Sequence, residues 1–411
     1  MGNLEGVHSG FVQLEGARRI RFHVLTAGEP TGEPVVFIHG NASSATFWQE
    51  AMVCLPSRFQ SIAPDLRGYG LTEPLAVDAT RGVRDWCDDL HALLEFMDLE
   101  HVHLVGWSMG GGVSLQYLLD HPGMVASLTL VSTVSPYGFS GTRGADGEPC
   151  FRDYSGSGAG GVNPEFIAQM KAQNRESGES PVLPRNVLNF TYWKPPFRAS
   201  REEDFLTSLL QTAVGDYNYP GDWVPSPNWP GFAPGPNGVL NAFSPKYFNA
   251  GGIVNLDSKP PILWIRGADD QLVSDAALWD IAYLGKLGLA PGWPGDDVCP
   301  PQPMLAQTRA VLDEYKLKGG CYREVVFADC GHSPHVVLPH RAGIARFVAD
   351  DRASAETQNA CAVDLARHRP RSARPRPAVC RNRTSGRPRR RHSRQSPANP
   401  RVAASPQQGF P

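Results

Sequence analysis

The stretch HVHLVGWSMGGGVSLQYLLDHP, residues 101–122, constrains the fold of this chain more than any other part of it. A short apolar run passes through a Gly-containing turn into an apolar segment of helix length, which predicts a strand, a tight turn and a helix. Gly106 and Gly110 flank Ser108 in a G-x-S-x-G pattern, where small residues allow close backbone approach. The spacing alone is a weak signal. In this context it predicts a serine hydroxyl held above the edge of a sheet, at the positive end of a helix.

Short apolar runs alternate with helical patterns on both sides of this stretch. Residues 10–28 alternate polar and apolar side chains around a turn, which predicts an antiparallel strand pair. The other runs are short and β-branched, and such strands between helices indicate a parallel sheet covered on both faces. We therefore predict an α/β protein with a mostly parallel, doubly wound sheet. Its further elements are strands at 33–38, 59–64, 127–133, 260–267 and 323–330 and a helix at 81–98.

The alternation of strands and helices breaks twice, and these breaks suggest the domain organisation. Residues 136–258 are rich in Gly, Pro, Asn and aromatic residues, and we interpret them as a large insertion. A second Gly/Pro-containing segment, 284–320, separates the last two predicted strands. Within the large insertion we expect helices at 164–176 and 201–213, and we assign the sheet core to residues 1–135 and 259–350.

The net charge of −2 conceals an uneven distribution along the chain. Residues 1–350 carry 25 basic and 38 acidic side chains, whereas residues 351–411 carry 14 arginines, no lysine and 3 acidic side chains. This Arg/Pro-rich tail has no hydrophobic periodicity and too little apolar surface to offset the entropy of ordering, so we predict disorder. Arginine without lysine is typical of GC-rich DNA read in an unintended frame, so we interpret the tail as functionless. Nucleic-acid binding is the alternative, and the acidic core argues against it.

A serine hydroxyl becomes a nucleophile at neutral pH when a base accepts its proton, and this base is usually a histidine oriented by a carboxylate. Two positions after predicted strands supply these groups. Asp270, next to Asp269, follows the run PILWIRG, and His332 follows EVVFADC. In parallel α/β sheets the site lies just past the carboxyl ends of the strands. Ser108, Asp270 and His332 therefore form a candidate nucleophile, acid and base.

The motifs HGNASS, DLRGYG, GWSMGG, GADDQLV and CGHSP follow one another in the order known from the α/β-hydrolase family. The chain resembles that family over residues 10–135 and 259–350. The resemblance implies the same triad and favours Asp270 over Asp269, because the family usually places the acid three residues after the Gly that ends the strand.

The resemblance also implies an oxyanion hole and a lid. The backbone N–H groups of Met109 and Asn41 would form the oxyanion hole, with Ala42 as the alternative to Asn41. The insertion 136–258 stands where relatives carry a lid or cap, and its aromatic residues are candidate walls for an apolar substrate. The candidate substrate-binding residues are Trp107, Tyr192, Trp193, Trp223 and Trp229, and packing in the lid's own core is the alternative for those of the insertion.

These features indicate a cofactor-independent serine hydrolase of the carboxylic-ester hydrolase class. It would cleave a small apolar or aromatic ester or lactone through an acyl-enzyme. Two alternatives use the same triad and stay open: hydrolysis of a C–C bond in a diketone-like substrate, and acyl transfer or perhydrolysis as in non-haem haloperoxidases. The complete triad argues against a non-catalytic ligand-binding protein. The sequence has no H-E-x-x-H, P-loop or spaced Cys/His set, so we expect no metal and no nucleotide.

The sequence further predicts a protein of the cytoplasm. No apolar run approaches the ~18–20 residues that cross a bilayer, and the first residues lack the pattern of a secretory signal. Eight cysteines without a C-x-x-C pair are typical of reduced thiols. We therefore expect no membrane partner. The oligomeric state stays open, with a homodimer as one option.

Overall fold

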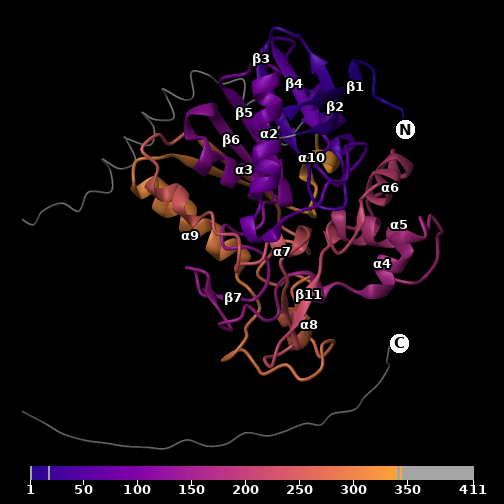
Figure 1. Ribbon diagram of the computed structural model, residues 1–411, viewed down its shortest axis with the longest axis vertical. Helices are drawn as coiled ribbons and strands as arrows, with labels where there is room; N and C mark the ends of the chain where they lie inside the picture. Colours follow the sequence, from indigo (N-terminus) through magenta and orange to yellow (C-terminus); the bar gives the residue numbers. More distant parts are fainter. Residues whose placement is uncertain (1, 17–18, 340–342, 345–411) are drawn as a thin grey trace, which may run out of the picture. The chain divides into compact units, whose positions relative to one another are not determined.

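An eight-stranded mixed sheet runs through the described part of the chain (Figure 1). The structure, a computed structural model, describes residues 2–16, 19–339 and 343–344, so the tail 351–411 lies outside the described residues. The pairs β1–β2 and β2–β4 are antiparallel and the other neighbours are parallel, which confirms the mostly parallel α/β sheet. In spatial order the strands are β1 (Val7–Leu14), β2 (Ile20–Gly28), β4 (Phe59–Pro64), β3 (Glu33–Ile38), β5 (Val102–Trp107), β6 (Val125–Val131), β13 (Ile262–Gly267) and β14 (Tyr322–Phe327).

The burial of each strand follows from its place in the sheet. Every residue of β5 is buried, as expected for a central parallel strand with both faces covered. The edge strands β1 and β14 are largely exposed or half-buried. The central strands therefore supply the apolar core, and their carboxyl ends come together at one edge of the sheet.

Helices pack against this sheet in two groups. Helix α3 (Met109–Asp120) packs against β5 and β6 and also contacts α2 (Arg84–Phe96). Helix α2 falls within the predicted range 81–98. Helix α1 (Gln49–Val53) contacts β2 and α10 (Pro334–Val337), and α10 contacts β13. Within the segment 284–320, helix α9 (Met304–Leu317) follows the part in which most of its Gly and Pro residues lie.

The long segment between β6 and β13, residues 132–261, contains short elements that share the core of the sheet. Phe205 of this segment packs its ring 4.5 Å from that of Phe47, centroid to centroid. In Figure 1 its magenta helices lie to one side of the sheet. Its elements are β7 (Thr142–Arg143), β8 (Glu148–Pro149), α4 (Pro164–Lys171), α5 (Pro184–Val187), a π-helix at Leu188–Tyr192, α6 (Glu202–Leu210), β9 (Val214–Gly215), β10 (Tyr219–Pro220), β11 (Trp223–Pro225), β12 (Phe232–Pro234) and α7 (Val239–Ala242).

The two helices expected in this segment are present as α4 and α6, each shorter than predicted. A second segment of little regular structure, residues 268–303, follows β13 and contains the short helix α8 (Ile281–Lys286). Among the described residues, no helix is both long enough and apolar enough to cross a bilayer.

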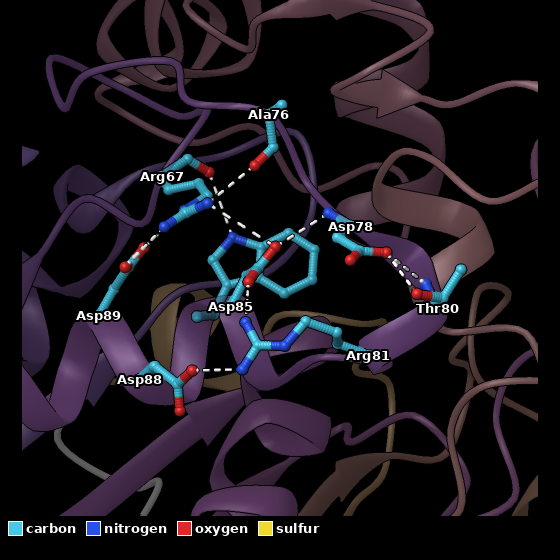
Figure 2. A network of polar contacts seen from close by, with 9 residues as sticks. Arg67, Ala76, Asp78, Thr80, Arg81, Asp85, Asp88 and Asp89 are labelled. Atoms are coloured by element: carbon cyan, nitrogen blue, oxygen red, sulfur yellow. Dashed lines mark hydrogen bonds and ion pairs between the residues drawn. The ribbon is translucent and has the colours of Figure 1, made fainter. Parts of the chain in front are cut away.

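A buried ion-pair network ties the loop after β4 to the start of α2 (Figure 2). The Arg67 guanidinium donates from Nε and Nη2 to the two carboxylate oxygens of Asp89, at 2.6 and 2.7 Å, and from Nη1 to the Ala76 carbonyl at 2.8 Å. Asp85 pairs with both Arg67 and Arg81. The Arg67 and Asp89 side chains are 9% and 2% exposed, so partners within the protein, rather than water, compensate most of their charge.

Candidate active site

Ser108 lies on the turn between β5 and α3, in a backbone conformation that few residues adopt. Its φ is +56°, in the left-handed region that side chains other than Gly seldom occupy. A Cβ on Gly110 would lie 2.2 Å from the carbonyl oxygen of Ile38, and one on Gly106 would lie 2.4 Å from that of Gly110. The two glycines of the G-x-S-x-G pattern are therefore required by close backbone approach, as the sequence predicted.

His332 and Asp270 form a buried hydrogen-bonded pair. His332 Nδ1 lies 2.8 Å from Asp270 Oδ2, and the residues are 1% and 6% exposed. The other carboxylate oxygen, Oδ1, accepts hydrogen bonds from the amides of Leu272 at 2.8 Å and Val273 at 3.0 Å. These bonds hold the carboxylate in one orientation. When Nδ1–H donates to Asp270, Nε2 is the nitrogen that can accept a proton.

Asp269 has a different environment from its neighbour. Its carboxylate lies 3.1 Å from Lys194 Nζ, and its side chain is 39% exposed. Asp270, and not Asp269, is therefore the residue hydrogen-bonded to His332.

Ser108 and His332 border the same cavity. The indole N–H of Trp107, directly before the serine, donates to the backbone carbonyl of His332 at 3.0 Å and joins the two loops. In the described part of the chain no hydrogen bond connects Ser108 Oγ to the imidazole. Such bonds are often long in ligand-free sites and shorten when substrate binds.

Three backbone amides near Ser108 are available to an oxygen atom in the cavity. Within the described residues, no protein group accepts a hydrogen bond from the N–H of Asn41, Ala42 or Met109. Met109 is the first residue of α3, where helix amides have no acceptor within the helix. Tyr192 donates to the carbonyls of Asn41 and Ala42 at 3.0 Å each, and Tyr69 donates to Asn41 Oδ1 at 2.8 Å. These tyrosines fix the loop that carries the two amides.

The cavity has mostly apolar walls drawn from the sheet edge and from both irregular segments. It encloses about 1,080 Å³, a volume that includes open solvent at its mouth. Its apolar and aromatic lining residues are Ala42, Trp107, Met109, Val134, Phe139, Val162, Phe166, Val187, Tyr192, Tyr219, Val239, Leu240, Phe243, Leu272, Val273, Trp279 and Ile281.

Of the five aromatic residues predicted to contact substrate, Trp107 and Tyr192 line this cavity. The other three do not, which corrects the prediction. Trp193 is buried in the 132–261 segment against Phe205, Trp223 is 55% exposed on β11, and the Trp229 indole donates to a loop carbonyl, that of Pro291. Composition could not tell which side of the segment each tryptophan would occupy.

His335 is a buried histidine that does not contact the cavity. Its ring lies between Trp48 and Trp107, at centroid distances of 4.2 and 4.8 Å, and its residue is fully buried. Among the described residues neither ring nitrogen has a hydrogen-bond partner. Burial, assisted by the nearby His332, holds the pKa of His335 well below its usual 6.5. The described residues contain no cluster of His, Cys, Asp or Glu that could hold a metal ion.

Comparison with known proteins identifies the fold. A sequence model of a family described as alpha/beta hydrolase fold matches residues 33–145. An esterase, RhEst1 from Rhodococcus sp. ECU1013, has a crystal structure that superposes with a TM-score of 0.50 at 18% identity, covering 85% of this chain and 98% of that one. The esterase EaEST from Exiguobacterium antarcticum also gives 0.50 at 18% identity, over 83% of this chain and 98% of its own.

The similarity to curated relatives covers part of each chain. A 2-hydroxymuconate semialdehyde hydrolase from Pseudomonas sp. (strain CF600) is 29% identical over 196 residues, 47% of this chain and 62% of the relative. This chain thus spans less than two thirds of the length of that relative. Uncharacterized mycobacterial proteins also match, such as Rv2715 of Mycobacterium tuberculosis, and the matched region covers 29% of the length of that relative.

Proposed function

We propose that this chain, whose residues 33–145 match the model of the alpha/beta hydrolase fold family, is a serine hydrolase that cleaves a carboxylic ester or lactone. The observation that carries the proposal is the buried His332–Asp270 pair beside the cavity that Ser108 borders. The esterases that share the fold support this reaction class.

The proposed reaction begins when His332 Nε2 accepts the hydroxyl proton of Ser108 while Oγ attacks the carbonyl carbon. The amides of Met109 and Asn41, or of Ala42 in place of Asn41, donate to the oxygen that becomes negatively charged. Collapse of this intermediate expels the alcohol, which takes the proton from His332. Water then attacks the acyl-enzyme with the same histidine as base, and this step releases the acid and restores the serine.

The 132–261 segment is proposed to act as the lid of this site. Tyr192, Phe166 and Leu240 of this segment line the cavity together with residues at the ends of the sheet strands, such as Trp107. The segment would therefore select the substrate, while the strand ends supply the reacting groups.

The test is a substrate panel of p-nitrophenyl esters, an aromatic lactone and a vinylogous diketone, run with wild type and Ser108→Ala. We expect ester or lactone turnover in wild type, none above background in Ser108→Ala, and labelling of Ser108 by a fluorophosphonate. Ser57→Ala, at an exposed position, is the control and should keep full activity. Turnover that survives Ser108→Ala would overturn the nucleophile. Preferential cleavage of the diketone would replace the ester reaction by C–C bond hydrolysis.

A further inference from the structure

The cavity beside Ser108 offers no charged partner to a substrate. In the described structure its lining includes no Lys, Arg, Asp or Glu, and His332 is the only basic side chain. The carboxylate nearest to the reaction is Asp270, directly behind that histidine. Burial raises the pKa of Tyr192, so this phenol stays neutral in the range where the enzyme would work. A carboxylate entering the cavity would lose its water and gain no counter-charge.

Two aromatic side chains meet at the cavity from opposite segments. Phe166 lies on α4 of the 132–261 segment, and Trp279 lies in the 268–303 segment just before α8. Their ring centroids are 6.1 Å apart at an interplanar angle of 89°, an edge-to-face contact. Both residues line the cavity, Phe166 almost fully buried and Trp279 half-buried. In this pair the two segments meet at the cavity wall.

Resting on the proposed function, we propose that the site selects uncharged esters and that Trp279, with Phe166, limits the length of their apolar part. An apolar chain replaces water against apolar side chains along the cavity, so each added methylene should raise kcat/KM by about fourfold. The gain ends where the chain reaches the Phe166–Trp279 contact, because a packed wall resists added volume.

The charge selection is tested with p-nitrophenyl hydrogen adipate and its methyl ester, which differ by one negative charge and one methyl group. We expect wild type to prefer the methyl ester by at least about a hundredfold in kcat/KM. Leu240→Lys places a cation on the half-buried α7 wall and should raise kcat/KM for the acid by about tenfold or more, whereas the length-matched Leu240→Met should not. Equal rates of wild type on the two substrates, or no gain in Leu240→Lys, would overturn charge selection.

The length limit is tested with p-nitrophenyl esters from acetate to laurate. Trp279→Ala should move the optimum to longer acyl chains, and Trp223→Ala, which removes an exposed tryptophan outside the cavity, should leave it unchanged. Circular dichroism checks that each variant is folded. An optimum that stays in place in a folded Trp279→Ala protein would overturn the role of Trp279. Ser108→Ala distinguishes failure of the proposed function from failure of the selectivity proposal. If this variant still hydrolyses the esters, the proposed function is wrong; if it is inactive, a negative result with the Trp279 or Leu240 variants overturns only the selectivity proposal.

Discussion

His335 makes the stability of this protein depend on pH in a way that one substitution can isolate. In the folded chain the imidazole is fully buried and its pKa is held well below 6.5, whereas in the unfolded chain it titrates near 6.5. The unfolded state therefore binds more protons as pH falls, and the free energy of unfolding falls with it. If the folded chain keeps this ring neutral, the free energy of unfolding should fall by about 1.4 kcal/mol from pH 7.5 to 5.5. The reason is that protonation of His335 raises the population of the unfolded state about tenfold over this interval.

The assay is urea unfolding of wild type and His335→Phe at both pH values. The variant should lose about 1.4 kcal/mol less than wild type over this interval, whatever its stability at pH 7.5. His39, another buried histidine whose pKa burial lowers, is present in both proteins, so its contribution cancels. His335→Leu should behave as His335→Phe does, because neither variant can bind the proton. If all three proteins lose the same free energy, the ring is either protonated in the fold or accessible to solvent.

Three other substitutions test the site and its supports. Asp270→Asn should lower kcat by up to about 10⁴ at unchanged circular dichroism, because the histidine loses the partner that fixes its tautomer, whereas Asp269→Asn should change it little. If Asp269→Asn lowers kcat more than Asp270→Asn does, Asp269 would be the carboxylate that orients His332. Gly110→Ala should lower the free energy of unfolding, measured with urea, by about 1–3 kcal/mol, because its Cβ would lie 2.2 Å from a backbone oxygen. If the variant is as stable as wild type, the turn at Ser108 can relax to accept the methyl group. Arg67→Met should cost about 3–5 kcal/mol by leaving Asp89 without the guanidinium, and adding Asp89→Leu should restore most of it. A loss below about 1 kcal/mol would mean that water compensates Asp89.

The parts of the fold that could be predicted from the sequence are those in which local pattern and burial agree. The run Val102–Trp107 is apolar throughout and is buried throughout, so its pattern identified a central strand. The turn at Ser108 could be predicted because the close approach of Gly110 to Ile38 leaves room for no side chain. Asp270 was favoured over Asp269 by the family resemblance, in which the acid stands three residues after the Gly that ends the strand, here Gly267.

Features that depend on long-range packing could not be predicted in this way. Helix α9 was not predicted, although no Gly or Pro lies between Pro303 and Gly319 and Met304 begins the helix. Within α9 the buried positions recur at helical spacing, a signal that a shorter window would have found. Trp279 escaped notice because it lies outside the aromatic-rich segment, and only tertiary contact brings it to the cavity.

Under the proposed mechanism, Tyr192 would give the 132–261 segment a part in the chemistry as well as in the cavity walls. Its hydroxyl donates to the carbonyls of Asn41 and Ala42, two cavity-lining residues whose amides are proposed donors to the developing charge. A chimera that receives this segment from a relative without such a tyrosine would inherit a new pocket together with a loosened loop beside the nucleophile. Exchange of segments, by recombination in nature or by grafting in the laboratory, should therefore succeed only between donors that keep this hydroxyl. In this chain the Tyr192 hydroxyl would therefore limit how far the substrate range can change without loss of turnover.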